Sequence, residues 1–222
     1  MTPAPPEPPT GKKARTRRTL LEAAGELFAR KGVDATTVDE IAETAGVSVG
    51  SIYKHFGSKE ALAIAFIVDA FVVMEGYLDE AHAAESPIQR VFNAGEAYFR
   101  FAQEQPVACR FALARRMDPA ADSSGDPITK AVDSRIQKAI MRIAADLKES
   151  MRIGEVPVTP IDETMVFLWG SWSGVVALMI RADSLAIPPG LADRALAFGR
   201  AALMAGFNDA SHPGTFRTPA EA

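Results

Sequence analysis

The chain has 222 residues, 48% of them hydrophobic, which is enough apolar material for a core and excludes disorder over most of its length. Its one cysteine, Cys109, excludes an internal disulfide framework and fits a reducing cytoplasm. The net charge of −4 argues against a nucleic-acid partner, but the charge is unevenly distributed along the chain. Residues 11–60 carry nine Lys/Arg and seven Asp/Glu, whereas residues 61–222 carry 15 and 20.

Residues 1–16 predict a disordered arm in front of the first helix. Five of the first ten residues are proline, and they contain no apolar stretch typical of a secretory signal. Five cations then follow with no acid among them: Lys12, Lys13, Arg15, Arg17 and Arg18. Such a cluster is either a solvated tail or a contact to DNA phosphates, and the motif beside it favours the second interpretation.

Residues 17–62 predict a small domain of short helices separated by tight turns. Apolar residues recur at helical spacing between breaks and caps. The caps and breaks are Gly32, Thr37 with Glu40 as a capping box, Gly46, Ser48, Gly57 and Ser58.

Residues 63–210 predict a larger helical domain, followed by a flexible tail over 211–222. Its expected helices cover 87–105, 107–117, 128–152, 162–183 and 190–209, and a loop is expected over 118–127. No stretch shows sustained two-residue alternation, so the sequence predicts an all-α protein.

Residues 37–56 have the pattern of a helix-turn-helix. Two helices joined by a tight turn at Gly46 leave the second free to enter a major groove. In the second helix, Ile52 and Phe56 lie four residues apart and are expected to anchor it inward. Another face carries small, polar or basic residues suited to reading base edges: Ser48, Ser51, Lys54 and His55. From spacing alone, an ordinary antiparallel helix pair remains an alternative.

The same stretch resembles the DNA-binding domain of TetR-type repressors. The resemblance covers the basic arm and about 50 residues at fixed spacings: Leu27-Phe28-Ala29, Lys31-Gly32, Thr36-Thr37, Ile41-Ala42, Ala45-Gly46-Val47, Ile52-Tyr53-Lys54-His55-Phe56 and Ser58-Lys59-Glu60-Ala61-Leu62. The rest of the chain fits that family in layout, with a helical region that binds a ligand and dimerises. The resemblance therefore favours DNA reading over a helix pair that merely packs.

The resemblance implies roles for individual residues. Phosphate contacts are expected from Thr37, Tyr53, His55 and Lys59, and base contacts from Val49, Gly50, Ser51 and Lys54. Arg17 from the arm and Ser48 from the polar face complete the expected set of DNA contacts. Gly50 has no side chain and Val49 could touch only a thymine methyl, so part of the specificity is expected from the arm or from DNA shape.

The last two expected helices are rich in small residues at four-residue spacing. These are Gly170, Gly174, Ala177, Ala195, Gly199 and Ala202. Small residues let helix backbones approach closely. The resemblance implies that the two helices form a two-fold homodimer interface, and packing within one subunit is the alternative.

The helix expected over 162–183 is apolar nearly all round, so it needs partners on more than one side. A second subunit on one face and a cavity for a small, mostly apolar effector on another would satisfy it. The candidate pocket residues are Tyr98, Phe99, Phe111, Trp169 and Trp172. Each of them fits an ordinary core as well.

Membrane and enzyme functions are not expected. The apolar run over 164–180 is short of the roughly 20 residues that a membrane span needs, so it predicts a buried helix. No glycine-rich phosphate loop or nucleophile motif is present, and His82 with Glu85 lacks a third metal ligand nearby. No cofactor is expected.

The sequence thus predicts a cytoplasmic repressor that binds double-stranded operator DNA as a homodimer and is released by a small apolar effector. An activator, a regulator controlled by a protein partner, and a helical interaction protein remain alternatives.

Overall fold

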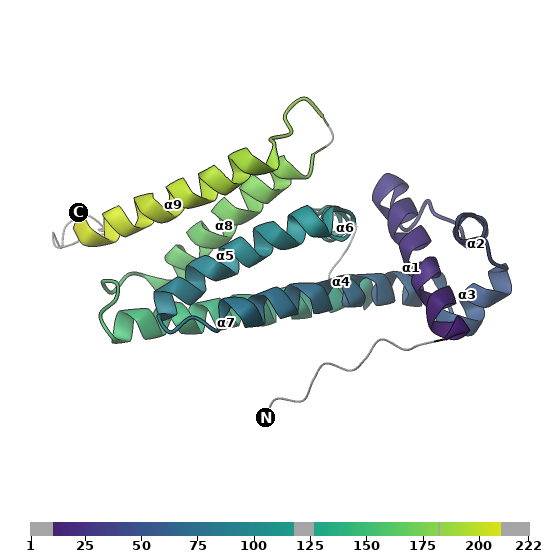
Figure 1. Ribbon diagram of the computed structural model, residues 1–222, viewed down its shortest axis with the longest axis horizontal. Helices are drawn as coiled ribbons and strands as arrows, with labels where there is room; N and C mark the ends of the chain where they lie inside the picture. Colours follow the sequence, from purple (N-terminus) through teal and green to yellow (C-terminus); the bar gives the residue numbers. More distant parts are fainter. Residues whose placement is uncertain (1–10, 118–126, 182, 210–222) are drawn as a thin grey trace. The chain divides into compact units, whose positions relative to one another are not determined.

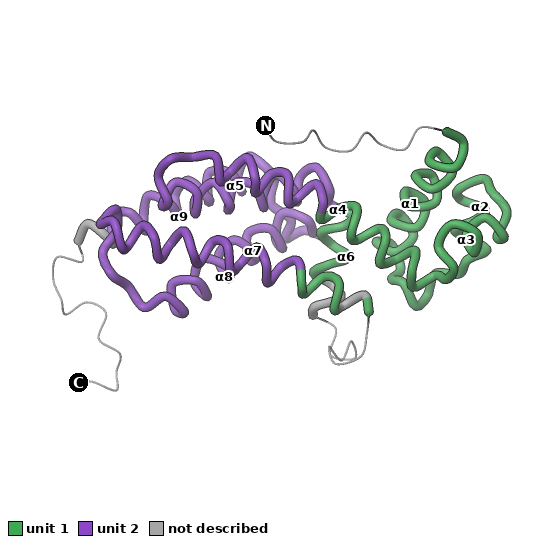
Figure 2. Tube along the Cα trace, turned by 90° about the horizontal axis from the view of Figure 1, so that it is seen from below, with its two compact units in different colours: residues 1–71, 107–134 green, residues 72–106, 135–222 purple. Residues whose placement is uncertain are grey.

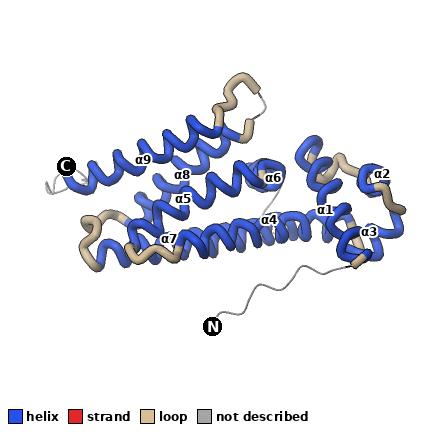
Figure 3. The backbone as a smooth tube through the Cα atoms, in the orientation of Figure 1, coloured by secondary structure: helices blue, strands red, loops and turns tan. Residues whose placement is uncertain are grey.

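The computed structural model describes residues 11–117, 127–181 and 183–209, and within these ranges it contains helices and no strand (Figures 1 and 3). The expected all-α fold class is confirmed. The helices are α1 Lys12–Lys31, α2 Val38–Ala45, α3 Val49–Phe56, α4 Lys59–Ala81, α5 Pro87–Glu104, α6 Pro106–Met117, α7 Pro127–Arg152, α8 Ile161–Met179 and α9 Pro189–Asp209. Residues 1–10, nearly all of the expected loop over 118–127, and the expected tail lie outside the described residues.

Helix α1 differs from the sequence expectation at its start. It begins at Lys12, directly after Gly11, whereas the sequence predicted a disordered arm up to residue 16. Lysine, alanine and arginine are good helix formers and no breaker separates them, so the helix continues back to the glycine. The expected basic arm therefore includes the first turns of a helix.

The chain divides into two compact units, shown in green and purple in Figure 2. Unit 1 comprises residues 1–71 and 107–134, and unit 2 comprises residues 72–106 and 135–222. Helix α4 contributes its first half to unit 1 and its second half to unit 2. Unit 1 thus extends beyond the 17–62 domain that the sequence suggested, because it also takes in α6.

The core of unit 1 is built from α1 to α4 and α6. Leu20, Ile41 and Ile52 are fully buried and hold the first three helices together. An aromatic cluster adds α4 and α6: the ring of Phe28 stacks on Phe111 with 5.9 Å between centroids, and the ring of Phe66 meets both edge-on. Aromatic pairs at such distances contribute about 0.5–1.5 kcal/mol beyond their burial.

The core of unit 2 is built around α5, which packs against α8 and α9. Trp172 of α8 lies across Gly95 of α5 so closely that a Cβ atom at position 95 would stand 2.7 Å from the indole. The rings of Tyr98 and Trp169 stack beside them, with 5.5 Å between their centroids. Glycine at position 95 therefore sets how closely α5 and α8 approach.

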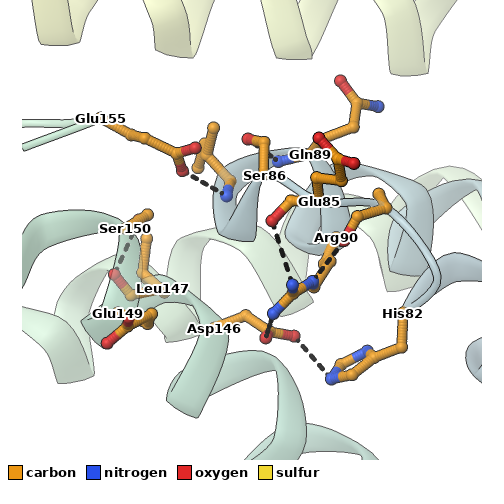
Figure 4. A network of polar contacts seen from close by, with 12 residues as sticks. His82, Glu85, Ser86, Gln89, Arg90, Asp146, Leu147, Glu149, Ser150 and Glu155 are labelled. Atoms are coloured by element: carbon orange, nitrogen blue, oxygen red, sulfur yellow. Dashed lines mark hydrogen bonds and ion pairs between the residues drawn. The ribbon is translucent and has the colours of Figure 1, made fainter. Parts of the chain in front are cut away.

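A polar network joins α4, α5 and α7 within unit 2 (Figure 4). The buried carboxylate of Asp146 faces His82, with Nε2 and Oδ2 2.9 Å apart, and Arg90, with Nη1 and Oδ1 3.5 Å apart. Arg90 also donates to the carbonyl oxygens of Ala84 and Glu85, which fixes the connection between α4 and α5. A buried charge needs such partners to offset its desolvation.

Among the described residues, one helix is long and apolar enough to cross a membrane by length and composition, and it is α4 rather than the 164–180 run considered from the sequence. Its most apolar stretch has a mean hydropathy of 2.0, and 39% of that stretch is buried. A core helix of a helical bundle passes the same test. Asp69 and Glu75 interrupt the stretch and pair with Arg17 of α1 and Arg135 of α7, respectively, as expected of a bundle helix.

Candidate nucleic-acid interface

Local interactions fix both ends of α2, the first helix of the motif. The backbone N–H of Glu40 donates to Oγ1 of Thr37, and the N–H of Thr37 donates to the Glu40 carboxylate at 2.9 Å, which is the capping box that the sequence predicted. At the other end of α2, Gly46 adopts φ 65° and ψ 35°, a left-handed conformation that other residues rarely adopt. Helix α2 therefore has two defined ends.

The Glu40 carboxylate has a second partner, the ammonium group of Lys31 at the end of α1. The hydrogen bond from Lys31, together with those from Thr37, lowers the pKa of Glu40 from 4.5 to about 2. Glu40 is therefore ionised at neutral pH and ties α2 to α1.

Lys59 was expected to bind DNA phosphate, but its ammonium group is already occupied. It donates to the carbonyl oxygens of Val33 at 2.8 Å and Thr36 at 2.9 Å, within the connection between α1 and α2. These carbonyls follow the end of a helix and need a donor. The side chain of Lys59 therefore stabilises the connection between α1 and α2. Only the backbone of Lys59, at the start of α4, remains available to a phosphate.

Arg17 also has a partner inside unit 1. Its guanidinium donates to both carboxylate oxygens of Asp69, at 2.8 and 3.4 Å, and lies 5.6 Å from the ring centroid of Phe56. It therefore links α1 to α4 and α3, which the sequence did not suggest. The exposed cations at the start of α1 are its neighbours Lys12, Lys13, Arg15 and Arg18, and none of them forms an ion pair with a described residue.

The outward side of α3 carries the remaining expected contacts. Tyr53 is 52% exposed, Lys54 is exposed without an ion-pair partner among the described residues, and His55 is half-buried beside Phe56. Buried Ile52 anchors the helix from the other side, as predicted. The helix therefore presents a polar, partly basic face to solvent.

The first turn of α3 is small and open. Ser48 and Ser51 place their hydroxyls 3.1 Å apart, and the Ser48 side chain caps no backbone N–H group. A Cβ atom at Gly50 would meet only the Ser48 hydroxyl, at 3.9 Å, so nothing within unit 1 requires glycine there. Val49 beside it is half-buried. Uncapped N–H groups at a helix start attract phosphate, and the small residues permit close approach.

Thr37 is less free than expected. Its hydroxyl donates to the Glu40 carboxylate at 2.9 Å as well as accepting from the Glu40 backbone. A phosphate contact from this hydroxyl would compete with the capping box.

The five aromatic residues proposed for the effector pocket belong to both units. Phe111 lies in unit 1 with Phe28, whereas the other four lie in unit 2. Tyr98, Phe99 and Trp172 are buried. Phe99 also lines a cleft that α5 forms with α9.

The small residues of α8 and α9 face open space rather than the interior of unit 2. A Cβ atom at Gly170, Gly174 or Gly199 would meet nothing within 4 Å. Large apolar side chains are exposed near them on the same helices: Val166 and Phe167 on α8, and Leu191 and Phe198 on α9. Ala177 and Ala195 are half-buried, and Ala202 is exposed. Close packing within one subunit therefore does not explain the glycines.

In the described part of the chain, no three His, Cys, Asp or Glu residues are grouped as metal ligands. Burial raises the pKa of the Cys109 thiol to about 12, which leaves it unreactive.

Taken together, a capped first helix, a left-handed glycine turn and an exposed polar second helix form a helix-turn-helix, the motif whose second helix can enter a DNA major groove. The sequence pattern of the family described as "Bacterial regulatory proteins, tetR family" matches residues 20–66. Residues 20–66 thus have the sequence of a DNA-binding domain of the tetR type.

Similar proteins agree with that assignment. The transcriptional repressor KstR2 of Rhodococcus jostii is 45% identical over 80 residues, which cover 36% of this chain and 35% of the relative. The match thus spans about a third of that relative's length. The structure of KstR2 of Mycobacterium tuberculosis has a TM-score of 0.66 at 22% identity, covering 82% of this chain and 91% of that one.

A further solved structure is that of AibR in complex with isovaleryl coenzyme A and operator DNA. It has a TM-score of 0.65 at 16% identity, covering 82% of this chain and 97% of the other. Likeness at this identity shows a shared fold.

Proposed function

We propose that this chain is a transcriptional repressor that reads a short operator with the outward face of α3. The observation that carries the proposal is that face itself: Ser48, Gly50 and Lys54 are exposed beside half-buried Ser51, and no contact within unit 1 requires glycine at position 50. Lys54 and the serines can bond base edges, while Tyr53 and the start of α1 supply phosphate contacts.

The proposed repressor is a homodimer formed through the apolar stripe, which we define as Val166, Phe167, Gly170, Gly174, Leu191, Phe198 and Ala202 of α8 and α9. Exposed phenylalanine beside open glycines is costly in water and well suited to helix–helix packing. A two-fold dimer presents two copies of α3 to two half-sites, so the operator should be palindromic.

The proposed effector is a small molecule that binds the helical domain and lowers operator affinity. AibR was solved with both a small molecule and operator DNA, and from it we take only that this fold accommodates both. The effector acts by favouring a dimer conformation that fits the half-sites poorly. Its influence is limited by the difference between its affinities for the two states, typically about 1–3 kcal/mol.

The proposal is tested by selecting duplexes from a random pool with the full chain at about 150 mM salt, a typical physiological ionic strength. We expect enrichment of one two-fold symmetric sequence. Lys54→Ala should weaken its binding, whereas Lys138→Ala, an exposed lysine on α7, should not. Absence of any enriched sequence, or equal effects of the two substitutions, would contradict base reading by α3.

A further inference from the structure

A cleft lies between α5 and α9, and both of its walls belong to unit 2. Its volume of about 390 Å³ is within the range of small-molecule sites. Phe92 and Phe99 of α5 and Leu196 of α9 supply its apolar surface. The cleft therefore offers a place for an apolar body, although it is not the aromatic pocket that the sequence suggested.

One of the two arginines at the rim is already neutralised. Arg100 donates from Nε to Glu104 and from Nη1 to Glu80, each at 2.9 Å, and its guanidinium lies 4.0 Å above the ring of Tyr77. Two carboxylates outside the cleft thus balance this cation. Arg100 leaves no net positive charge for a ligand.

The second arginine is shared between neighbours. Arg200 donates to Oε1 of Gln89 at 2.7 Å, and its guanidinium lies 5.0 Å above the ring of Phe92. Its Nη1 atom is 3.6 Å from Oε1 of Glu96, a loose ion pair. Glu96 therefore takes up part of the charge of Arg200.

Asp193 on the α9 wall has no cation. Its Oδ1 accepts from the amide of Gln103 at 3.1 Å, and no described cation lies within ion-pair distance of it. The rim thus carries two carboxylates, Glu96 and Asp193, against the one arginine that is not neutralised elsewhere. A negative charge beside an apolar surface favours a cation with an apolar body.

We propose that the α5–α9 cleft binds a lipophilic cation, such as an amine or quaternary ammonium compound. The apolar body rests on Phe99 and Leu196, and the charged nitrogen lies beside Asp193. An anionic amphiphile of the same size would face the carboxylate of Asp193, which no described cation compensates. The inference names the effector class of the proposed repressor, and it rests on that function only for its consequence for DNA.

A ligand in the cleft could influence the proposed dimer, because one wall of the cleft belongs to a helix that also carries part of the apolar stripe. Residues of α9 that line the cleft, such as Leu196 and Arg200, lie about half a helical turn away from Phe198 and Ala202 of the apolar stripe. The same helix thus carries the ligand on one side and the proposed partner subunit on the other. A ligand that moves α9 relative to α5 would move the dimer surface with it.

The test is calorimetric titration of the full chain, without DNA, using three probes with one decyl chain: decyltrimethylammonium, decanesulfonate and 1-decanol, each kept monomeric. We expect the ammonium probe to bind and the sulfonate to bind at least fivefold more weakly. Asp193→Asn should lower affinity for the ammonium probe by about fivefold, as for loss of one exposed ion pair, and leave 1-decanol unchanged. Asp162→Asn, an exposed carboxylate on α8 outside the cleft, is the matched control.

Ala197→Trp tests the location by filling the cleft from its exposed wall. It should abolish binding of both the ammonium probe and 1-decanol. Persistent binding by this variant, equal binding of the sulfonate, or equal effects of the two asparagine substitutions would overturn the proposal. Because no DNA is present, a cation-binding chain that ignores operator DNA would contradict the repressor function and leave this site intact.

Discussion

The imidazole Nε2 atom of His82 lies 2.9 Å from Oδ2 of the buried Asp146 carboxylate (Figure 4). Burial lowers the pKa of His82, and the cations Arg142 and Arg90 lower it further, whereas the carboxylates of Asp146 and Asp79 raise it. The first effect is the largest, so the folded chain holds a neutral imidazole at neutral pH.

This lowered pKa makes stability depend on pH. The unfolded chain binds a proton at His82 near pH 6.5, and the folded chain binds it only at lower pH. The contribution is therefore present above pH 6.5 and is lost as the pH falls through the folded pKa. We expect the free energy of unfolding, measured in urea, to be lower at pH 5.5 than at pH 7.5.

Glu40 does not contribute to this difference, because its pKa of 4.5 in the unfolded chain and about 2 in the folded chain both lie below pH 5.5. His82→Gln should reduce the difference in unfolding free energy between the two pH values. His55→Gln, on the outward side of α3, should leave it unchanged. An undiminished difference in the His82 variant would show that another group carries it.

The two lysines beside the recognition helix should behave differently. Lys59→Ala leaves the carbonyls of Val33 and Thr36 without their donor and should destabilise the fold by about 1–2 kcal/mol. Lys54→Ala should leave stability within about 0.5 kcal/mol, lower operator affinity and relax the sequence preference. Urea unfolding and fluorescence anisotropy with the operator and with altered duplexes measure the two effects. A Lys59 variant with normal stability but weak DNA binding would place its ammonium at the phosphate instead.

Substitutions at the two glycines of the helix-turn-helix should affect stability and DNA recognition differently. Gly50→Ala meets no crowding and improves helix propensity, so it should stabilise the fold by up to about 1 kcal/mol while lowering operator affinity or changing sequence preference. Gly46→Ala must adopt φ 65° and should destabilise by about 1–2 kcal/mol. Thermal unfolding and duplex selection are the measurements. Unchanged operator binding by the Gly50 variant would remove that turn from the DNA interface.

The ends of the helices at the site could be predicted from short sequence patterns. Which side chains remain available to DNA depends on contacts between residues far apart in the sequence. Thr37, Glu40 and Gly46 act within a few residues of one another, so the capping box and the turn could be predicted from the sequence. Lys59 and Arg17 meet partners 23 to 52 residues away, and no local pattern reveals such contacts. Both were expected to contact DNA, and the side chains of both have partners within unit 1.

The cleft between α5 and α9 was missed for the same reason. Its walls are joined by contacts such as that of Gln103 with Asp193, 90 residues apart. Sequence reasoning selected aromatic residues, since these are the commonest pocket surface, but Tyr98 and Trp172 were needed to fill the core around Gly95. The charge imbalance at Asp193 becomes visible only when the partners of every rim residue are known.

The proposed dimer surface can be tested at one glycine. A Cβ atom at Gly174 meets nothing within its own subunit, so Gly174→Leu should leave the monomer folded. If the apolar stripe packs against a second subunit, the added side chain overpacks the dimer interface and weakens association by about 1–3 kcal/mol, the typical cost of overpacking. The mass measured by light scattering at micromolar concentration should shift toward the monomer, and operator affinity should fall because the two half-sites are no longer bound together.

Gly76→Leu provides the matched control for that substitution. Gly76 is also a helical glycine with open space around its Cβ position, but it lies on α4, outside the apolar stripe. The Gly76 variant should keep the mass and DNA affinity of the wild-type chain. A wild-type chain that is monomeric at micromolar concentration would contradict the dimer and remove the argument for a palindromic operator. Equal behaviour of the two leucine variants would place the interface elsewhere on the chain.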